Sequence, residues 1–497
     1  MSRRESTLEA LLRGFSFSGT TAGLEISHIS LDSRKIKAGG LFVALRGEQF
    51  DARDFIPDVL QQGASAVLVE DEPDSQALDA RYPDRVIRVR NLRQALSGIA
   101  GRFYGHPSRQ LKLVGITGTN GKTTIAWYLA QVLEELGEVA GFMGTLGAGP
   151  VAGREGAALR FDNTGYTTPD PIQVQQGLYE MLSAGVKVVC MEVSSHALEL
   201  GRVADIEFDV VVFSNLSEDL LDFHHDMERY AAAMMRLFRD FSYRHAVINI
   251  DDPAGAQMLE SAGERGLAYG LRDGALRAVD VLAAQDGLQF RMLYGKQSLP
   301  LRTRLIGTFN AYNMLAVAGV IVSLGYSLAE LDEVITRCQP VPGRMQRIEA
   351  RPVQPGVVVD YAHTPDALEA ALRACRSHCQ GVLSVVFGCG GDRDRTKRPV
   401  MGRIAESVAD RVFITDDNPR NEPPVNIVAE ISRGMSRPAW IVHDRAAAIR
   451  AALELAGTGD WVLIAGKGHE CTQAFADRVL EFKDGEVARE ALERQAA

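Results

Sequence analysis

The segment from Gly115 to Thr124 holds the residues of this 497-residue sequence whose types and spacing best suit phosphate binding. It lies between an apolar run at residues 111–116 and an amphipathic run at residues 124–136, which predict a strand and a helix. A glycine-rich turn in that setting directs backbone N–H groups and the amino terminus of the helix at phosphate oxygens. The turn therefore predicts an ATP-binding loop formed by Gly118, Thr119, Asn120, Gly121, Lys122, Thr123 and Thr124.

Two side chains of this loop can act on phosphate directly. Lys122 would neutralise the β- and γ-phosphates, and the hydroxyl of Thr123 would hold Mg²⁺ beside them. The usual motif has a glycine where this chain has Ile116, so we interpret the loop as a P-loop variant in which Gly115 and Gly118 form the turn. The alternative is a glycine-rich turn with a surface lysine, but the strand, the glycines, the Lys-Thr pair and the helix all agree with a phosphate loop.

The elements that must position this loop belong to an α/β protein. Short apolar runs alternate with helical patterns along the whole chain, which predicts sheets covered by helices. The apolar runs of the middle third resemble buried parallel strands, and the Pro and Gly at residues 341–343 indicate a linker. We predict three domains, at residues 1–108, 109–342 and 343–497, with a central parallel-sheet P-loop ATPase domain and a C-terminal Rossmann-like α/β domain.

Composition limits the classes of function that remain. The formal net charge is −10, which argues against a nucleic-acid scaffold with a basic surface. The six cysteines are scattered, and the sequence contains neither a secretory signal nor an apolar run of membrane-spanning length. We expect a reduced, cytoplasmic protein, a monomer that acts on small molecules without nucleic acid or membrane insertion.

Eight motifs along the chain resemble those of the Mur ligases, from about Asp32 to Glu470. The resemblance is closest to the family members that add meso-diaminopimelate. It implies three domains, for a UDP-sugar, for ATP and for the incoming amino acid. The motifs are Gly118-Thr-Asn-Gly-Lys-Thr-Thr124, Met191-Glu-Val-Ser-Ser-His196, Phe309-Asn-Ala-Tyr-Asn313, Gly343-Arg-Met345, Val359-Asp-Tyr-Ala-His-Thr-Pro365, Gly388-Cys-Gly-Gly-Asp-Arg-Asp394, Asp417-Asn-Pro-Arg420 and Gly466-Lys-Gly-His-Glu470.

The reaction that the resemblance implies is ATP-dependent amide formation in peptidoglycan biosynthesis. ATP phosphorylates the D-glutamate side-chain carboxylate of UDP-N-acetylmuramoyl-L-alanyl-D-glutamate, and the amine of diaminopimelate displaces the phosphate. Lys122, with Mg²⁺ on Thr123 and Glu192, fits the charge neutralisation that phosphoryl transfer needs. An ordinary ion pair is the alternative for Glu192, although Glu192 directly follows an apolar strand and could face the phosphates.

The resemblance also assigns substrate contacts. For the UDP-muramyl peptide it implies Ser33, Glu48, Gln49 and Phe50 in the first domain and Thr167, Thr168, Ser194 and Arg202 in the second. For the base and ribose of ATP it implies Asn310, Asn313, Arg344 and Asp360, although each asparagine alone could be a helix cap.

The motif that ends at Arg420 carries the specificity. Diaminopimelate has a second amino-acid head whose carboxylate a guanidinium can bind through two hydrogen bonds, and lysine has no such group. Arg420 therefore predicts diaminopimelate as substrate rather than L-lysine. By resemblance, the other residues around this ligand are Arg393, Asp417, Asn418, Pro419, Gly466 and Glu470, the last suited to the distal ammonium.

The chain departs from the family at two positions. Relatives have a histidine and a carbamylated lysine that hold a second Mg²⁺, and this chain has Leu220 and Met234 there. Neither side chain is a credible ligand for a hard cation. Our hypothesis is a rebuilt site in which one Mg²⁺ on Thr123 and Glu192 suffices. His224 or His225 could supply a donor or a positive charge, or both could lie in a solvated loop.

Two other functions remain as alternatives. One is ligation like that of folylpolyglutamate synthase, which the amino-terminal α/β domain and the Asp-Asn-Pro-Arg motif oppose. The other is a nucleotide-binding protein that has lost catalysis. The presence of Lys122, Thr123, Glu192 and Arg420 together opposes it.

Overall fold

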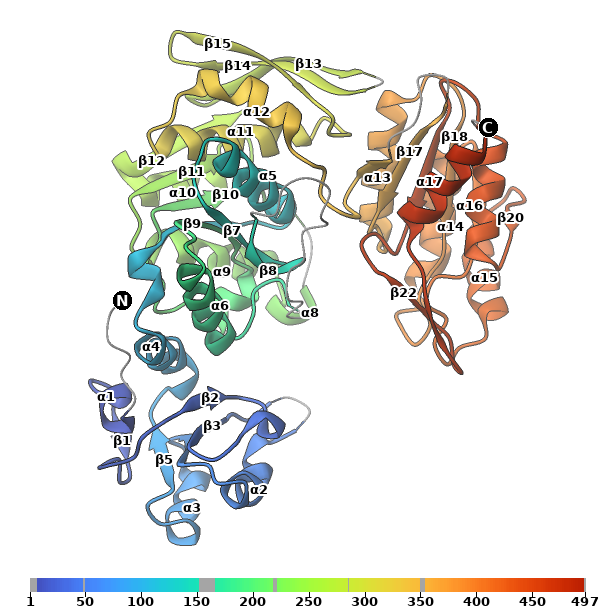
Figure 1. Cartoon of the computed structure of the whole chain (residues 1–497). Coiled ribbons are helices and arrows are strands. Elements are labelled where there is room, and N and C mark those ends of the chain that lie inside the picture. Colours follow the sequence, from blue (N-terminus) through green and yellow to red (C-terminus); the bar gives the residue numbers. More distant parts are fainter. Residues whose placement is uncertain are drawn as a thin grey trace. The chain divides into compact units, whose positions relative to one another are not determined.

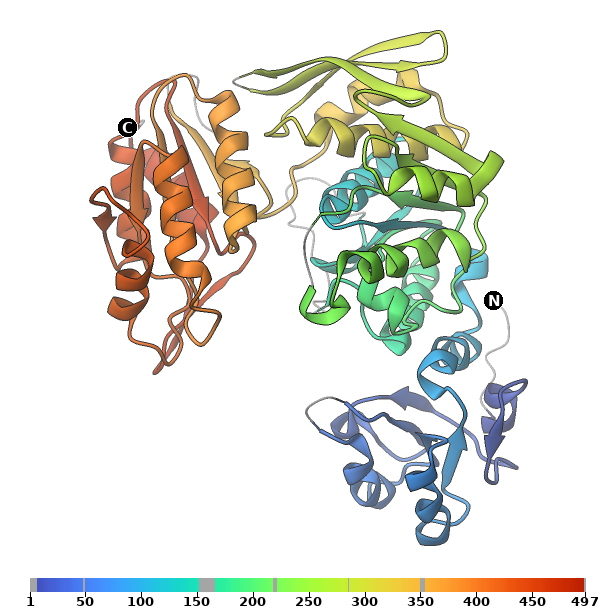
Figure 2. The ribbon, with the colours of Figure 1, turned by 180° about the vertical axis from the view of Figure 1, so that it is seen from behind.

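The computed structural model describes residues 7–47, 50–151, 166–217, 221–284, 286–348 and 354–495. The chain forms two compact units, one of residues up to Gly274 with Ala316–Ser327, and one of Ala275–Leu315 with Leu328 onward. Figures 1 and 2 trace the elements of each unit.

The first unit begins with a five-stranded sheet of order β1-β5-β4-β3-β2, in which only β1 is antiparallel to its neighbour. Along β3 the side chains of Leu41 and Val43 enter one apolar core, and those of Phe42 and Ala44 enter the core on the other face. Both faces are thus covered by helices. The elements are α1 (Leu8–Leu12), β1 (Phe17–Ser18), β2 (His28–Ser30), η1 (Ser33–Lys35), β3 (Gly40–Ala44), η2 (Ala52–Phe55), α2 (Ile56–Gln61), β4 (Ala66–Glu70), η3 (Pro73–Ser75), α3 (Gln76–Arg81), β5 (Val86–Val89), α4 (Leu92–Tyr104) and η4 (Pro107–Gln110).

A second sheet of the first unit has the order β12-β11-β10-β6-β9-β7-β8. Its neighbours are parallel except for β8, which is antiparallel to β7. Its elements are β6 (Lys112–Thr117), α5 (Lys122–Glu135), β7 (Ala140–Gly144), β8 (Gly147–Pro150), α6 (Pro171–Ser183), β9 (Val188–Glu192), α7 (Ser195–Glu199), β10 (Val210–Phe213), α8 (Leu221–His224), α9 (Met227–Arg239), β11 (His245–Asn249), α10 (Gly255–Ala262), η5 (Gly263–Arg265) and β12 (Gly266–Gly270).

The second unit starts with an antiparallel meander, β13 (Leu276–Ala284), β14 (Gly287–Tyr294) and β15 (Gln297–Thr303). Helix α11 (Asn310–Ser323) begins in this unit and ends in the first, and η6 (Leu328–Glu330) and α12 (Leu331–Arg337) follow.

The rest of the second unit is a six-stranded sheet of order β16-β17-β21-β18-β19-β20, parallel except for β16. One face packs on α13, α14 and α15 and the other on α16 and α17. The elements are β16 (Gln346–Ile348), β17 (Gly356–Asp360), α13 (Pro365–His378), β18 (Leu383–Phe387), α14 (Lys397–Val408), β19 (Arg411–Ile414), α15 (Pro424–Ser432), β20 (Trp440–Ile441), α16 (Arg445–Glu454), β21 (Trp461–Ala465), β22 (Thr472–Ala474), β23 (Val479–Glu481) and α17 (Asp484–Gln495).

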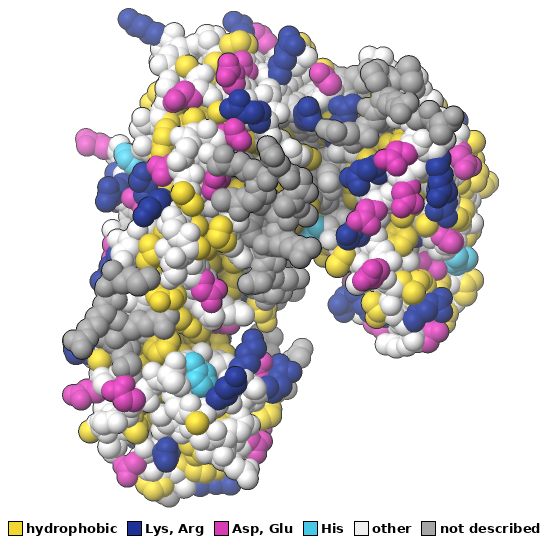
Figure 3. Space-filling model, viewed as in Figure 1, with side chains coloured by type: hydrophobic (Ala, Val, Ile, Leu, Met, Phe, Trp, Pro, Cys, Tyr) yellow, Lys and Arg dark blue, Asp and Glu magenta, His cyan; other side chains and the backbone are white. Residues whose placement is uncertain are grey.

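The predicted α/β class is confirmed. The prediction of a parallel sheet in the middle third was incomplete, because β8 and the meander are antiparallel. Among the residues described, none of the helices combines the length and the apolar character needed to span a bilayer. Figure 3 shows basic and acidic side chains interspersed over the described surface on the face it presents.

Candidate active site

The phosphate loop connects the carboxyl end of β6 to the first residue of α5. Gly118 has a φ of 137°, and an added Cβ there would lie 2.0 Å from Oγ of Ser214, so only glycine fits. The backbone N–H groups of Thr119 and Asn120 donate to O and Oδ1 of Asn215 at 2.8 and 3.0 Å. Residues at the end of the neighbouring strand β10 therefore fix the loop.

Lys122 lies over the loop that precedes it. Its Nζ donates to the carbonyl oxygens of Gly118 and Thr119 at 2.6 and 2.9 Å. This places a positive charge at the amino terminus of α5, where the helix dipole also favours anions.

The carboxylate of Glu192 lies at the carboxyl end of β9, next to β6, and is only 1% exposed. Oγ1 of Thr123 donates to its Oε2 at 2.9 Å, and the N–H and Oγ1 of Thr145 donate to Oε1 at 2.8 Å and to Oε2 at 3.3 Å. A Cβ added at Gly144 would lie 2.1 Å from Oε1. Carboxylate and hydroxyl oxygens are the ligands that Mg²⁺ prefers, so Thr123 and Glu192 fit one such ion.

Thr145 was not among the predicted site residues. It follows β7, which pairs with β9, so a polar residue after the apolar segment 140–143 was the available signal. The hydrogen bonds of Thr145 hold Glu192 in place.

Three of the residues predicted to bind the muramyl peptide are connected to the backbone of Glu192 by hydrogen bonds. Oγ1 of Thr168 donates to the carbonyl of Glu192 at 2.8 Å and accepts from the N–H of Ser194 at 3.0 Å. Nη1 of Arg202 donates to the carbonyl of Thr168 at 2.7 Å. These side chains therefore form one hydrogen-bonded group with the strand that carries the acidic residue.

The other residues predicted for this substrate lie on different elements. Oγ1 of Thr167 accepts from Oγ1 of Thr145 at 3.3 Å. Ser33 begins η1 in the N-terminal sheet region, and Phe50 is 65% exposed. Glu48 and Gln49 lie outside the described residues.

His224 is buried rather than solvated. Its Nε2 lies 2.8 Å from Oγ of Ser195, and its ring stacks on Tyr230 with centroids 4.9 Å apart. The hydroxyl of Tyr230 lies 3.1 Å from Oγ1 of Thr119 in the phosphate loop. The solvated-loop interpretation is therefore wrong for His224, whereas His225 is exposed and fits it.

Met234 belongs to the apolar core of the first unit. It is fully buried and packs in the same cluster as Phe213 and Leu237, and Leu220 lies outside the described residues. No group of three or more His, Cys, Asp or Glu side chains suited to a metal occurs within the described ranges. The donors at Thr123 and Glu192 fit one cation, and position 234 offers no ligand to a second.

In the second unit, the two predicted asparagines bind each other at the start of α11. Nδ2 of Asn313 donates to Oδ1 of Asn310 at 2.6 Å, and Nδ2 of Asn310 donates to the carbonyl of Ile306 at 2.8 Å. Both are buried, so their amides fix the first turn of the helix.

Asp360 lies at the carboxyl end of β17, close to Arg344. Its oxygens accept from the N–H groups of Met345 and Ala362 at 2.6 and 2.9 Å. Burial raises the pKa of Asp360, although these N–H groups and Arg344 oppose the shift. The guanidinium of Arg344 lies 4.7 Å from the ring centre of Tyr361. The fold thus brings the four predicted nucleotide residues together as two pairs, Asn310 with Asn313 and Arg344 with Asp360.

Two arginines flank Gly390 in the loop after β18. A Cβ added there would lie 2.9 Å from Nη1 of Arg420 and 3.6 Å from Cγ of Arg393. Nη1 of Arg420 donates to the carbonyl of Gly391 at 2.8 Å, and a Cβ at Gly391 would lie 1.8 Å from the carbonyl of Pro419. The two loops touch through backbone, which only glycine permits.

Acidic and amide side chains line the neighbouring strand ends. Burial raises the pKa of Asp417, and a Cβ at Gly466 would lie 2.5 Å from its Oδ2. Nδ2 of Asn418 donates to Oε2 of Glu470 at 2.8 Å, and Nζ of the buried Lys467 donates to Oδ1 of Asn418 and to the same Oε2, both at 3.0 Å.

Lys467 and its neighbours favour the ionised form of Glu470. Burial alone would raise the pKa of Glu470, but Lys467, Asn418 and His469 together outweigh this effect and hold the pKa below its usual value. Lys467 was missed as a site residue, although its place in a Gly-Lys-Gly turn directly after a strand was a signal.

Comparison with protein families gives three matches. The Mur ligase family catalytic domain matches residues 25–104, the Mur ligase middle domain matches residues 116–321, and the Mur ligase glutamate ligase domain matches residues 343–468.

Comparison with individual proteins agrees. The chain is 45% identical over 476 residues to the UDP-N-acetylmuramoyl-L-alanyl-D-glutamate–2,6-diaminopimelate ligase of Ectopseudomonas mendocina, covering 95% of this chain and 96% of that protein. A solved structure of an enzyme of the same description has a TM-score of 0.73 at 33% identity and covers both chains completely. The Mycobacterium tuberculosis folylpolyglutamate synthase shares the fold, with a TM-score of 0.58 at 16% identity over 80% of this chain and 93% of that one.

Proposed function

Because this chain belongs to the Mur ligase family, we propose that it uses ATP to join 2,6-diaminopimelate to UDP-N-acetylmuramoyl-L-alanyl-D-glutamate. The product is an amide of the peptidoglycan precursor. The observation that carries the choice of amino acid is the pair of arginines beside Gly390, because diaminopimelate differs from lysine by a carboxylate and guanidinium groups recognise carboxylates.

The first half-reaction is phosphoryl transfer. The D-glutamate side-chain carboxylate attacks the γ-phosphorus, the bond to ADP breaks, and an acyl phosphate forms. Lys122 and the N–H groups of the phosphate loop offset the charge on the transferring group. Glu192 holds the hydroxyl of Thr123 in place, and Mg²⁺ bound to these two residues would neutralise the β- and γ-phosphates.

The second half-reaction is amide formation. The amine of diaminopimelate attacks the acyl carbon, the bond to phosphate breaks, and an amine proton is released. Arg420 and Arg393 bind the distal carboxylate, and the ionised Glu470 binds the distal ammonium. The other residues of this pocket are Asp417, Asn418, Pro419 and Gly466.

The remaining predicted contacts belong to the two nucleotide-bearing substrates. The muramyl peptide and UDP are assigned to Ser33, Glu48, Gln49, Phe50, Thr167, Thr168, Ser194 and Arg202, and the base and ribose of ATP to Asn310, Asn313, Arg344 and Asp360. The proposal also includes a single catalytic Mg²⁺, a monomer and a cytoplasmic location, where ATP and reduced cysteines coexist.

The test is ADP and phosphate release by the purified full-length chain with ATP, Mg²⁺ and the UDP-muramyl dipeptide. We expect release with diaminopimelate and little with L-lysine or L-ornithine. Equal rates with L-lysine would contradict the specificity. ATP binding without ADP formation in the presence of both co-substrates would favour the alternative of a nucleotide-binding protein without catalysis. Glutamate addition to a folate would favour the folylpolyglutamate synthase alternative.

A further inference from the structure

The residues proposed to bind the amino acid lie on two neighbouring loops of the second unit. One loop follows β18 and contains Gly390 and Gly391, and the other follows β19 and contains Asn418 and Arg420. The N–H of Gly391 donates to the carbonyl of Asn418 at 2.9 Å, and Nη1 of Arg420 donates back to the carbonyl of Gly391 at 2.8 Å. A shift of either loop would therefore move the guanidinium of Arg420.

A buried arginine outside both loops joins them. Arg398 lies in the first turn of α14, and its side chain is fully buried. Nη1 and Nη2 donate to the two carboxylate oxygens of Glu422, each at 2.7 Å, and Nη2 also donates to the carbonyl of Gly390 at 3.1 Å. Nη1 makes a further bond of 2.7 Å to Glu430 on α15. Figure 1 shows α14 and α15 side by side in this part of the chain.

Glu422 completes the connection. Glu422 lies two residues after Arg420. Its Oε2 also accepts from the N–H of Asp392, in the loop after β18, at 3.4 Å. Nδ2 of Asn421 donates to the carboxylate of Asp392 at 3.0 Å. The guanidinium of Arg398 thus binds the loop after β19 through Glu422, the loop after β18 through Gly390, and helix α15 through Glu430.

We propose that Arg398 is a positioning residue that sets the spacing of these two loops and so places Arg420 for the distal carboxylate of diaminopimelate. The inference rests on the proposed function. The guanidinium of Arg398 is fully buried and bidentate, so its replacement removes the two shortest ion-pair contacts of Glu422, which is only 13% exposed. Arg398 itself contacts the loops from behind and is not assigned to the substrate.

The test compares Arg398→Lys, Arg398→Gln and Glu422→Gln with the wild type in steady-state kinetics. The matched control is Arg395→Gln. Arg395 pairs with the same Glu430 and lies 3.8 Å from Oε1 of Glu422, but it is 61% exposed, and exposed pairs contribute little. We expect Arg398→Gln and Glu422→Gln to raise the KM for diaminopimelate about tenfold, as for a lost charged hydrogen bond. The KM for ATP and kcat at saturating diaminopimelate should stay within about twofold, and the control should match the wild type.

Arg398→Lys should raise the KM for diaminopimelate less than Arg398→Gln does, because lysine keeps the positive charge but cannot make the bidentate hydrogen bonds. If Arg398→Gln does not fold, Arg398→Lys and Glu422→Gln still test the role of Arg398. A diaminopimelate KM within twofold of the wild type in these folded variants would overturn the proposal, as would an equal rise in the KM for ATP. A wild type inactive with diaminopimelate refutes the proposed function instead, and is seen before any variant is made.

Discussion

Glu192 and Thr123 form the most constrained pair in the phosphate site. The carboxylate is buried and accepts from one hydroxyl of the phosphate loop and from two donors of Thr145. Such a carboxylate is oriented before any ligand binds. Preorganised charges of this kind make the largest contribution to stabilising a phosphoryl-transfer transition state.

Glu192→Gln is expected to lower kcat by at least about a hundredfold, because the amide has nearly the same shape but loses one acceptor oxygen and the negative charge that would hold the cation. The measurement is phosphate release over a Mg²⁺ titration. Glu134→Gln is the control, since Glu134 is also buried and accepts from the N–H of Ala140 on β7. Equal activity of both variants would remove Glu192 from the mechanism.

Arg420→Ala is expected to raise the KM for diaminopimelate between about ten- and a hundredfold, the range for losing a hydrogen bond to a charged group. The KM for the UDP-muramyl dipeptide should not change. Arg411→Ala is a useful comparison, since Arg411 donates to the carbonyl of Leu455 from β19 at the other end of that strand. An unchanged diaminopimelate KM in Arg420→Ala would remove the specificity argument.

Residue identity predicted the strand, the glycine turn and the helix around Lys122, because the glycines, lysine and threonine are adjacent in sequence. It missed Thr145, Lys467 and Arg398, which reach the site only because their strands and helices are neighbours in space. Their contacts depend on which strands and helices are neighbours in the fold, and a local sequence pattern does not predict that order.

At the scale of elements, α9 places Met234 in the apolar core. Its buried residues are Tyr230, Ala233, Met234, Leu237 and Phe238, a spacing of three and four that forms one apolar stripe. Met234 lies in the middle of that stripe, so its side chain completes the core of the first unit.

Met234→Leu is expected to cost less than about 1.5 kcal/mol of unfolding free energy and to leave the Mg²⁺ dependence of phosphate release unchanged. Met234→Lys places a charge in the core and should cost about 3–5 kcal/mol. Thermal unfolding and a Mg²⁺ titration measure both effects. If Met234→Lys instead raised activity or made the Mg²⁺ dependence cooperative, the hypothesis of a single cation would be wrong.

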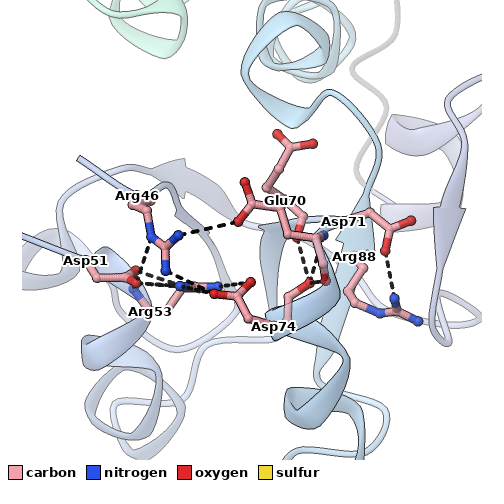
Figure 4. A network of polar contacts seen from close by, with 9 residues as sticks. Arg46, Asp51, Arg53, Glu70, Asp71, Asp74 and Arg88 are labelled. Atoms are coloured by element: carbon pink, nitrogen blue, oxygen red, sulfur yellow. Dashed lines mark hydrogen bonds and ion pairs between the residues drawn. The ribbon is translucent and has the colours of Figure 1, made fainter. Parts of the chain in front are cut away.

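An ionic network holds the segment before η2 in the N-terminal sheet. Figure 4 shows Arg53 between Asp51 and Asp74, with Arg46 beside them. Asp51 also caps η2 by accepting from the N–H of Arg53 at 3.0 Å. This network fixes the residue that follows Phe50.

The stabilisation from Asp51 should depend on pH in a defined direction. The guanidinium of Arg53 lowers the pKa of Asp51 to about 2, below its unfolded value near 3.9. The contribution is therefore complete above about pH 5 and is lost as the pH falls towards 2. In urea unfolding, Asp51→Asn should be less stable than wild type by about 1 kcal/mol at neutral pH, with a gap that closes in acid. A difference in unfolding free energy that did not change with pH would contradict this expectation. Asp54→Asn in η2 is the control.

Element prediction succeeded where strands are buried on both faces. The run at residues 111–116 appears as β6, and the apolar strand expected before Glu192 appears as β9, which ends at Glu192. The meander was missed because its strands alternate buried and exposed residues and contain polar side chains, as β13 does with its Arg277 and Asp280. Weak alternation of this kind does not separate a strand from a loop.

At the scale of the whole molecule, the chain crosses between its two compact units three times, after Gly274, Leu315 and Ser327. Sequence order therefore does not follow the compact units in the region from β12 to α12. By contrast, every strand and helix of the C-terminal sheet lies between Gln346 and Gln495. Its two apolar cores are drawn from that range except for Ile306 and Met345.

A fragment of residues 343–497 is accordingly expected to fold on its own, with one cooperative thermal transition followed by circular dichroism. The control fragment ends at residue 468, where the family match ends, and so lacks β22, β23 and α17. Asp484 on α17 accepts two hydrogen bonds of 2.7 Å from Arg445, and both side chains are fully buried. Its removal leaves an unpaired guanidinium in the core at a cost of about 3–5 kcal/mol, so the shorter fragment should not unfold cooperatively. If the shorter fragment is as stable as the longer one, the segment after residue 468 is not needed for the domain to fold. The boundary at residue 343 would be unaffected by that result.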